Sequence, residues 1–589
     1  MKLKKNNNNP INHTKNLNEL TGLSLDINNN LNLSKNEDML NYSAAVYALF
    51  VDHLNFLVDD STFYNRDRLI IDSKSFLPLL YGMYFLSGRD AEIKDLKDKK
   101  YLESNFKIGT ICPDALCYSV GAALGERHVK GLLNVDGVSY NIYTFLSPEK
   151  LSSGLSYSSA RLAVSLKLNN LIAISENKYD LYSEYENLGF NVISTDNDYE
   201  KITSALDSAK KSNMPSLVLI NTSSYDYDIN NISDVKNKLN VRDIEFAISN
   251  DVMEDIEYLI DNRVKNLEKT FKSSIANLDS ESSLILKALL LNNKRVSSSN
   301  IVFMPEDGAS NLENSCKLLN SYFDNTNILI NTSTDFDRFK NTIGDGVLRD
   351  SDYKNVNIDL SLNKHSGSYI INGLTESGLR PVIYSDIRES SYFLPAIEYA
   401  KENHLPIIYV LVGKSPFDIT NLRNIDIDMF TPFDTNELVG SFKAVMSKEE
   451  DPSIIVVCEK NMEIFDASSI NDTVMGGYVI EKEKLEFDGI LVSSSEDVEL
   501  AIDVSKKLFS KGLDFRVVSV PNLKRFLEQS EEYRDNVLPV EKRKIIIENS
   551  SSTYWNKIVF NSKYILNSKD FNELDDNDAF AKKIESLIK

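Results

Sequence analysis

Residues 145–180 read FLSPEKLSSGLSYSSARLAVSLKLNNLIAISENKYD, and this stretch decides the fold. The apolar run 143–146 predicts a strand, the apolar spacing over 156–168 predicts a helix, and 171–174 predicts a buried strand. Together they form one βαβ unit. A ligand phosphate normally binds such a unit at the strand end, where free amides and the helix dipole favour negative charge. That strand end carries Ser147, Pro148 and Glu149.

The alternation of strand and helix continues along the chain. Further strands are expected at 190–194 and 216–221, in a second group at 300–304, 327–330, 381–385, 406–412 and 453–458, and in a third group at 489–493, 516–520 and 544–548. Helical patterns separate these strands. The sequence therefore predicts an α/β protein with open parallel sheets covered by helices on both faces.

Composition excludes several classes of function. The 589 residues are 42% hydrophobic and 26% charged, which is typical of a globular protein of about three to four domains. A formal net charge of −22 opposes binding to nucleic acid or to anionic lipid. No apolar run is long enough to span a membrane, and the first residues lack the apolar core of a secretory signal. We therefore expect a cytoplasmic protein without disulfides, whose four cysteines are buried thiols.

Several segments resemble one family. Residues 65–68 read NRDR before an expected short strand, LLY follows at 79–81, and SYIINGL and TPFDTNEL stand at 368–374 and 431–438. From Gly476 onwards the resemblance runs nearly position by position. The family is that of the transketolases, which act with thiamin diphosphate and a divalent metal. The resemblance implies an α/β fold of three doubly wound domains.

Composition and resemblance together predict the domain boundaries. Residues 1–35 are rich in Asn and Lys and poor in large apolar groups, so we expect them to be disordered. The resemblance then implies a pyrophosphate-type domain over 36–225, a helical connection over 226–290, a pyrimidine-type domain over 291–465 and a transketolase C-terminal-like domain over 466–589.

The metal ligands implied by the resemblance are replaced. They would stand at Pro148, Lys178 and Asp180, but proline has no donor atom and lysine brings positive charge to the place of the cation. Gly154 keeps a family glycine of the cofactor-binding turn. The family cofactors would be thiamin diphosphate and Mg²⁺ or Ca²⁺, and we expect this chain to use neither. A replacement ligand from Glu149 or Asp180 is the alternative.

The catalytic positions of the family are replaced as well, so that no catalytic residue is intact. Lys364 stands where the family has the glutamate that hydrogen-bonds the aminopyrimidine ring, and an ammonium group cannot accept that bond. Of the chain's five histidines, His365 alone falls at a family histidine position. Cofactor-binding residues implied by the resemblance are Tyr392, Asp307 and Gly154. Glu389 and Glu459 replace a family phenylalanine and a family arginine.

Three hypotheses follow. The first is a pseudoenzyme, a structural or regulatory subunit in a homodimer or in a heterodimer with an active transketolase-type chain, with no nucleic acid or membrane as partner. The second is a divergent active transketolase that moves two-carbon ketol units between sugar phosphates of the pentose phosphate pathway. The third is a cleft reused for an anionic metabolite through Lys74, Lys364 and Lys414.

Overall fold

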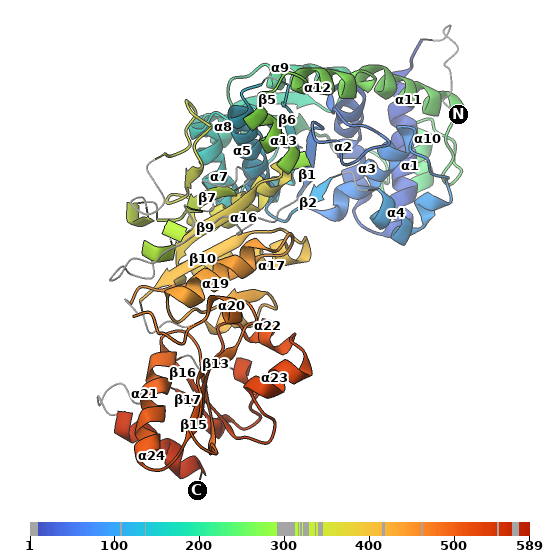
Figure 1. Ribbon diagram of the computed structural model, residues 1–589. Coiled ribbons are helices and arrows are strands. Elements are labelled where there is room, and N and C mark those ends of the chain that lie inside the picture. The colour runs from blue at the N-terminus through green and yellow to red at the C-terminus, as the bar shows by residue number, and fades with distance from the viewer. Residues whose placement is uncertain are drawn as a thin grey trace. The chain divides into compact units, whose positions relative to one another are not determined.

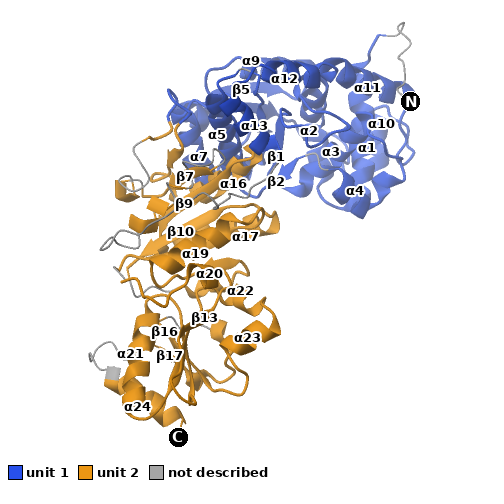
Figure 2. Ribbon diagram, in the orientation of Figure 1, with its two compact units in different colours: residues 1–290, 349–354 blue, residues 291–348, 355–589 orange. Residues whose placement is uncertain are grey.

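The computed structural model describes residues 10–106, 109–135, 137–290, 313–315, 317–318, 321, 329–335, 337–339, 346–414, 419–460, 463–549, 553–567 and 577–588. These residues divide between two compact units (Figure 2). Unit 1 comprises Met1–Leu290 and Arg349–Lys354, and unit 2 comprises Leu291–Leu348 and Asn355–Lys589. The strand predicted at 300–304 and Asp307 lie outside the described residues.

Unit 1 is built on a parallel sheet whose described strands follow the order β2-β1-β3-β4-β6-β5. The strands are β1 (Arg68–Ile71), β2 (Thr110–Ile111), β3 (Ile142–Phe145), β4 (Leu171–Glu176), β5 (Asn191–Asp196) and β6 (Ser216–Asn221). The βαβ unit predicted from residues 145–180 is confirmed as β3, α7 (Gly154–Ser165) and β4. Every residue of β3 and β4 is buried, so apolar side chains lie on both faces of the sheet. This is expected for the central strands of a parallel sheet that helices cover on both faces.

Helices cover both faces of this sheet. The described helices of unit 1 are α1 (His13–Leu31), α2 (Asn36–Ala48), the π-helical turn η1 (Leu49–His53), α3 (Leu77–Leu86), α4 (Lys99–Asn105), α5 (Ala115–Leu133), α6 (Pro148–Leu151), α7, α8 (Leu181–Leu188), α9 (Tyr199–Lys210), α10 (Ile232–Lys238), α11 (Asn250–Val264), α12 (Leu267–Ile275) and α13 (Ser280–Leu290). One core joins strand residues such as Phe145 and Ile172 to α1, α2, α3 and α11. Helices α5 and α7 pack together beside β3 and β4.

The expectation that residues 1–35 are disordered is wrong for most of the described part of that arm. Residues 13–31 form α1, which lies beside α2, α3, α10 and α11 (Figure 1). Leu20, Leu23 and Ile27 are buried on its packed faces. The many asparagines lower the mean hydropathy of this segment and hide its helical spacing. The helix is stabilised by tertiary packing, including the fit of Leu20 against Gly82 of α3.

A buried ion pair fastens α1 to α10. The Nζ atom of Lys236 lies 2.7 Å from Oδ1 of Asp26, and their side chains are only 2% and 4% exposed. The backbone amide of Phe246 also donates to Asp26, at 2.7 Å. Charged groups at this depth need their partners, because an unpaired buried charge has lost its hydration without compensation.

Unit 2 contains two sheets. The first is parallel, with described strands in the order β11-β12-β10-β9-β7-β8: β7 (Leu329–Ser333), β8 (Asn357–Asp359), β9 (Arg380–Asp386), β10 (Ile408–Gly413), β11 (Asp428–Phe430) and β12 (Ser453–Cys458). The second has the order β13-β15-β14-β16-β17: β13 (Tyr478–Glu481), β14 (Gly489–Ser493), β15 (Phe515–Ser519), β16 (Lys544–Glu548) and β17 (Ile565–Asn567). Only β13 runs antiparallel among these described strands.

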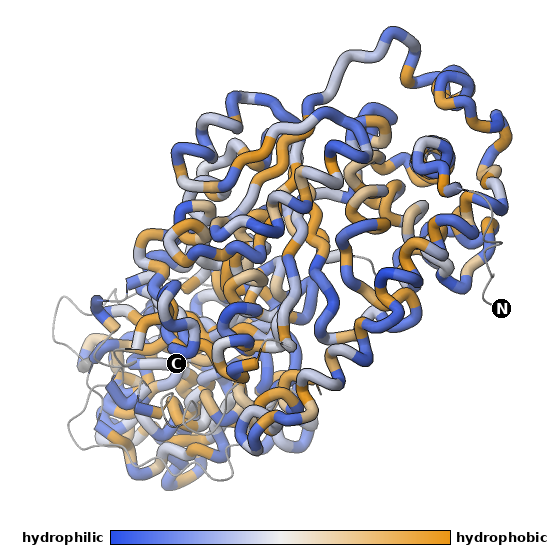
Figure 3. Tube along the Cα trace, turned by 90° about the horizontal axis from the view of Figure 1, so that it is seen from above, coloured by the Kyte–Doolittle hydropathy of each residue, from blue (hydrophilic) through white to orange (hydrophobic). Residues whose placement is uncertain are grey.

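The described helices of unit 2 flank these sheets. They are α16 (Lys364–Leu374), α17 (Ser390–Glu402), α18 (Thr420–Arg423), α19 (Thr435–Met446), α20 (Ile470–Thr473), α21 (Asp497–Ser510), α22 (Leu523–Leu527), α23 (Glu531–Val537) and α24 (Asn577–Ile588). Figure 3 shows that hydrophobic stretches are interrupted by polar ones at short intervals along the trace. In the part of the chain that the structure describes, no helix combines the length and apolar character needed to cross a membrane.

We predict that Lys236→Met lowers the free energy of unfolding by about 3 kcal/mol, because it leaves Asp26 buried without its cation. Differential scanning calorimetry of the full chain measures this loss. Lys272→Met is the matched control, since Lys272 pairs with Glu268 at 70% and 54% exposure, and should change stability by less than about 0.5 kcal/mol. Equal effects of the two substitutions would contradict the role given to the buried pair.

Candidate functional site

The NRDR segment that signalled the family has a packing role in unit 1. The side-chain amide of Asn65 donates to the carbonyl of Gly137 at 3.1 Å and accepts from the amide of Ser139 at 2.9 Å. Asp67 accepts from the backbone amide of Asn141 at 2.7 Å, and burial raises its pKa to about 6. This retained motif therefore fixes the chain that leads into β3.

The carboxyl ends of β1 and β3 are joined by a carboxylate of the chain itself. Asp72 follows β1 and accepts two hydrogen bonds from Ser147, from its amide at 2.7 Å and from its hydroxyl at 2.6 Å. Burial raises the pKa of Asp72 above its ordinary value. Pro148 follows, without an amide hydrogen or a polar side chain. A diphosphate approaching these strand ends would meet a carboxylate in place of donors.

The end of β4 is closed by internal contacts too. Lys178 forms an ion pair with Glu176 at 2.8 Å, and Thr222 donates a hydrogen bond to the same carboxylate at 3.1 Å. The hydroxyl of Tyr179 donates to Glu149 at 2.9 Å. The hydrogen bond that Lys178 donates to Glu176 is the main cause that raises the pKa of Lys178. Lys178 thus places positive charge at a position where the resemblance implies a metal ligand.

The remaining positions do not assemble a metal site. Asp180 accepts from the hydroxyl of Ser183 at 3.0 Å and has a positive φ of 56°, as it turns the chain into α8. Gly154 begins α7, and a Cβ atom there would meet nothing within 4 Å, so no close approach requires glycine. Over the described ranges, no group of three or more His, Cys, Asp or Glu side chains is arranged to hold a metal ion.

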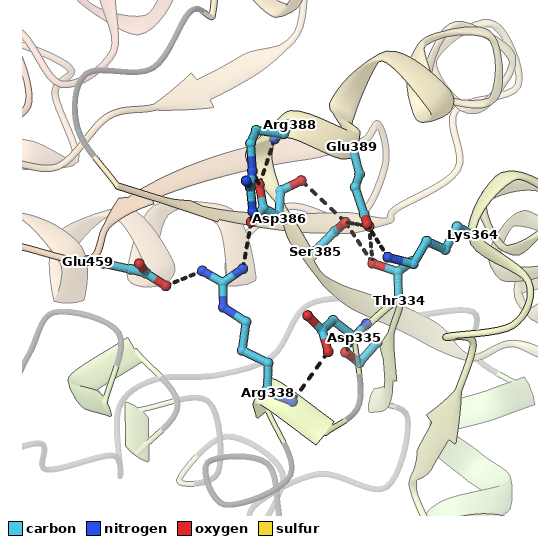
Figure 4. A network of polar contacts seen from close by, with 10 residues as sticks. Thr334, Asp335, Arg338, Lys364, Ser385, Asp386, Arg388, Glu389 and Glu459 are labelled. Carbon is cyan, nitrogen blue, oxygen red and sulfur yellow. Dashed lines mark hydrogen bonds and ion pairs between the residues drawn. The ribbon is translucent and has the colours of Figure 1, made fainter.

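In unit 2, Lys364 is engaged in an ion pair. It begins α16 and contacts the carboxylate of Glu389, which follows β9 (Figure 4). The other oxygen of Glu389 accepts from the hydroxyls of Thr334 at 2.8 Å and Ser385 at 3.0 Å. The hydrogen bond to Glu389 is the main cause that raises the pKa of Lys364. Two positions at which the resemblance implies a departure from the family pattern therefore contact each other.

A second set of charges lies beside this pair. Arg338 contacts Glu459 and donates to Asp386 at 2.7 Å, while Arg388 also donates to Asp386 at 2.7 Å and 2.8 Å (Figure 4). The bonds from Arg388, and then those from Arg338, hold the pKa of Asp386 well below its ordinary value. The resemblance leads one to expect an arginine at position 459. The chain has Glu459 there instead, and Glu459 pairs with Arg338.

The two other candidate residues of unit 2 contact each other. The rings of His365 and Tyr392 meet edge to face with their centroids 3.8 Å apart, and Tyr392 is 44% exposed. Lys74 in unit 1 and Lys414 in unit 2 are exposed. Asp307 lies outside the described residues, so its assignment stays a prediction.

The residues present do not fit thiamin diphosphate with a divalent metal. The strand ends of unit 1 offer Asp72 and the Glu176–Lys178 pair, whereas a metal-bound diphosphate needs several neutral or anionic oxygen ligands around one cation. In unit 2, the ammonium of Lys364 cannot accept a hydrogen bond from a pyrimidine ring. Sequence reasoning missed Asp72, Arg338 and Asp386. Asp72 could have been found, since it directly follows a predicted strand.

A retained acidic motif joins the two sheets of unit 2. Glu437 in TPFDTNEL is fully buried and accepts from the amide of Phe433 at 2.7 Å, the hydroxyl of Tyr478 at 2.9 Å and the hydroxyl of Ser519 at 2.6 Å. Tyr478 and Ser519 belong to β13 and β15. Burial, together with nearby Asp434, raises the pKa of Glu437 from 4.5 to about 7.

Parallel sheets with helices on both faces, followed by a mixed sheet, define a multidomain α/β protein of doubly wound type. Family comparisons identify it more closely. The family model described as "Transketolase, thiamine diphosphate binding domain" matches residues 12–288, and "Transketolase-like TK C-terminal domain" matches residues 476–585. The chain therefore belongs to the transketolase family.

Individual relatives agree over most of the chain. Transketolase of Bacillus subtilis is 24% identical and the match covers 87% of this chain and 88% of that protein; transketolase 1 of Saccharomyces cerevisiae is 25% identical, with 85% and 84% covered. Among solved structures, transketolase from Leishmania mexicana superposes with a TM-score of 0.83 at 20% identity, covering 93% of this chain and 92% of that one.

The raised pKa of Glu437 predicts a pH dependence of stability. Between pH 4.5 and 7 the folded chain keeps a proton that the unfolded chain releases, so this contribution is complete below pH 4.5 and is lost as the pH rises through 7. We expect Glu437→Gln to remove this decline, which is on the order of 3 kcal/mol. Calorimetric melting across this pH range measures it. Glu532→Gln, at an exposed glutamate, should keep the wild-type profile, and an unchanged profile in Glu437→Gln would contradict the assignment.

Proposed function

We propose that this transketolase-family chain has lost thiamin-diphosphate catalysis and serves as a structural or regulatory subunit. One observation carries the proposal, namely that Lys364 is paired with Glu389 at the position where the resemblance leads one to expect a catalytic glutamate. A lysine held in this way is protonated, so it neither accepts a hydrogen bond nor promotes deprotonation of a cofactor.

Unit 1 supports the proposal independently. Its strand ends place Asp72 against Ser147 and pair Lys178 with Glu176, so the chain's own groups satisfy one another where metal and diphosphate would be sought. At both sites, side chains of the chain itself therefore pair with one another where the family would bind its cofactor. Loss of a single ligand could be repaired by a neighbour, whereas two separately filled sites each need several changes to recover.

The proposed role requires a partner chain. Transketolase-type packing is retained over most of the sequence, including the C-terminal segment matched at residues 476–585. We propose a cytoplasmic homodimer, or a heterodimer in which an active transketolase-type chain supplies the chemistry. In the heterodimer this subunit would alter the stability or activity of its partner.

Two alternatives have weaker support. A divergent active transketolase would need replacement ligands, and the candidates Glu149 and Asp180 already accept hydrogen bonds from Tyr179 and Ser183. A cleft for an anionic metabolite would draw on Lys74, Lys364 and Lys414, but Lys364 faces a carboxylate. Turnover of xylulose 5-phosphate with ribose 5-phosphate by the purified chain would establish the first alternative.

We predict no saturable heat when the purified chain is titrated with thiamin diphosphate and Mg²⁺ up to about 1 mM, which corresponds to binding weaker than about 4 kcal/mol. The reason is that the metal positions hold Pro148 and a paired lysine. Transketolase of Bacillus subtilis, titrated in the same buffer, is the positive control. Magnesium-dependent binding in the micromolar range would overturn the proposal.

We also predict that the chain associates. Size-exclusion chromatography with light scattering should give twice the mass of one chain, or a one-to-one complex when an active transketolase from the same source is added. A solitary monomer under both conditions would count against a subunit role. It would leave the result of the cofactor titration unaffected, so the two parts of the proposal can fail separately.

A further inference from the structure

A set of charged side chains lies at the carboxyl ends of β7, β9 and β12 in the parallel sheet of unit 2 (Figure 4). Arg338 lies beyond β7, Asp386 ends β9, and Glu459 follows β12. Lys364 begins α16, and Glu389 ends the short turn η5 (Ile387–Glu389) after β9. Ligands of open α/β sheets bind at this edge. Here the edge is spanned by side chains of the chain itself.

The carboxylates are the buried members of this set. The side chains of Asp386, Glu389 and Glu459 are 9%, 15% and 17% exposed, whereas those of Arg338 and Lys364 are 24% and 41% exposed. The cations therefore cover the carboxylates from the solvent side. Removal of Lys364 would leave the largely buried carboxylate of Glu389 with only the hydroxyls of Thr334 and Ser385 as donors, which is costly in free energy.

Each of the two charges at positions 364 and 389 is unfavourable without the other. Glu389 alone would place a carboxylate near Asp335 and Asp386, and both of these act on Lys364 to raise its pKa. Lys364 alone would lose the partner that fixes its ammonium at the start of α16, where the helix dipole disfavours positive charge. The pair satisfies both requirements at once.

We propose that these residues form an internal lock, a charge-paired closure that holds the strand ends of this sheet in their final arrangement without a bound cofactor. The lock consists of Lys364 with Glu389, and of Arg338 with Asp386 and Glu459. It rests on the proposed function, because it assumes that this site binds no thiamin diphosphate. It goes further, because it assigns the replaced residues a joint role in stability.

A charge swap in the full-length chain tests the lock. Lys364→Glu and Glu389→Lys should each lower the melting temperature by about 2–4 °C. The double variant restores an ion pair of reversed sense, since Lys at 389 can still donate to the hydroxyls of Thr334 and Ser385, and it should melt within about 1 °C of wild type.

The matched control is the exposed pair of Lys460 and Glu499, 2.9 Å apart with side chains 55% and 53% exposed. Its single reversals should each change the melting temperature by less than about 1 °C. If the single reversals in the lock fail to fold, Lys364→Gln and Glu389→Gln replace them and remove one charge each. The loss of melting temperature in their double variant should then be smaller than the sum of the two single losses.

Additive losses in the double variant, in either cycle, would overturn the lock. Losses in the control pair as large as those in the lock would overturn it as well, because they would reflect general charge sensitivity. Binding of thiamin diphosphate by the wild-type chain, measured separately, overturns the proposed loss of catalysis. Additivity between positions 364 and 389 overturns the lock even when no cofactor binds.

Discussion

The ion pair between Lys364 and Glu389 is the interaction on which the account of this chain depends. A parallel sheet directs the carboxyl ends of its strands to one edge, where backbone amides and helix termini favour ligands. If the family ligand has been lost, as we propose, those ends must still satisfy their polar groups. Unit 2 does so by pairing charges, and unit 1 does so with Asp72 bound to Ser147. The same physical requirement is met twice by different residues.

What the chain retains follows from the same reasoning. Asn65 and Asp67 hold the backbone that leads into β3, and Glu437 fastens the parallel sheet of unit 2 to the mixed one. These polar groups are buried, so replacing any of them would leave partners unsatisfied. Residues whose only task was to contact a ligand carry no such constraint. Under the proposed function, the family likeness persists in polar packing residues and is lost at strand ends.

Much of the fold could be predicted from sequence, because buried parallel strands appear as continuous apolar runs, as in LIAISE at 171–176. Helix α1 could not, since its stability depends on distant contacts such as that of Asp26 with Lys236. The candidate site was predicted position by position from the resemblance. The pairing of position 364 with 389, and of Arg338 with Glu459, depends on how strands separated by long stretches of sequence meet in the sheet.

The most direct test is a crystal structure of the full chain grown with excess thiamin diphosphate and magnesium. The account predicts the contact between Lys364 and Glu389 and the two bonds from Ser147 to Asp72, with no density for cofactor or metal at the carboxyl ends of β3 and β4. Ordered cofactor density there, with Lys178 turned away from Glu176 and an oxygen ligand in its place, would contradict it.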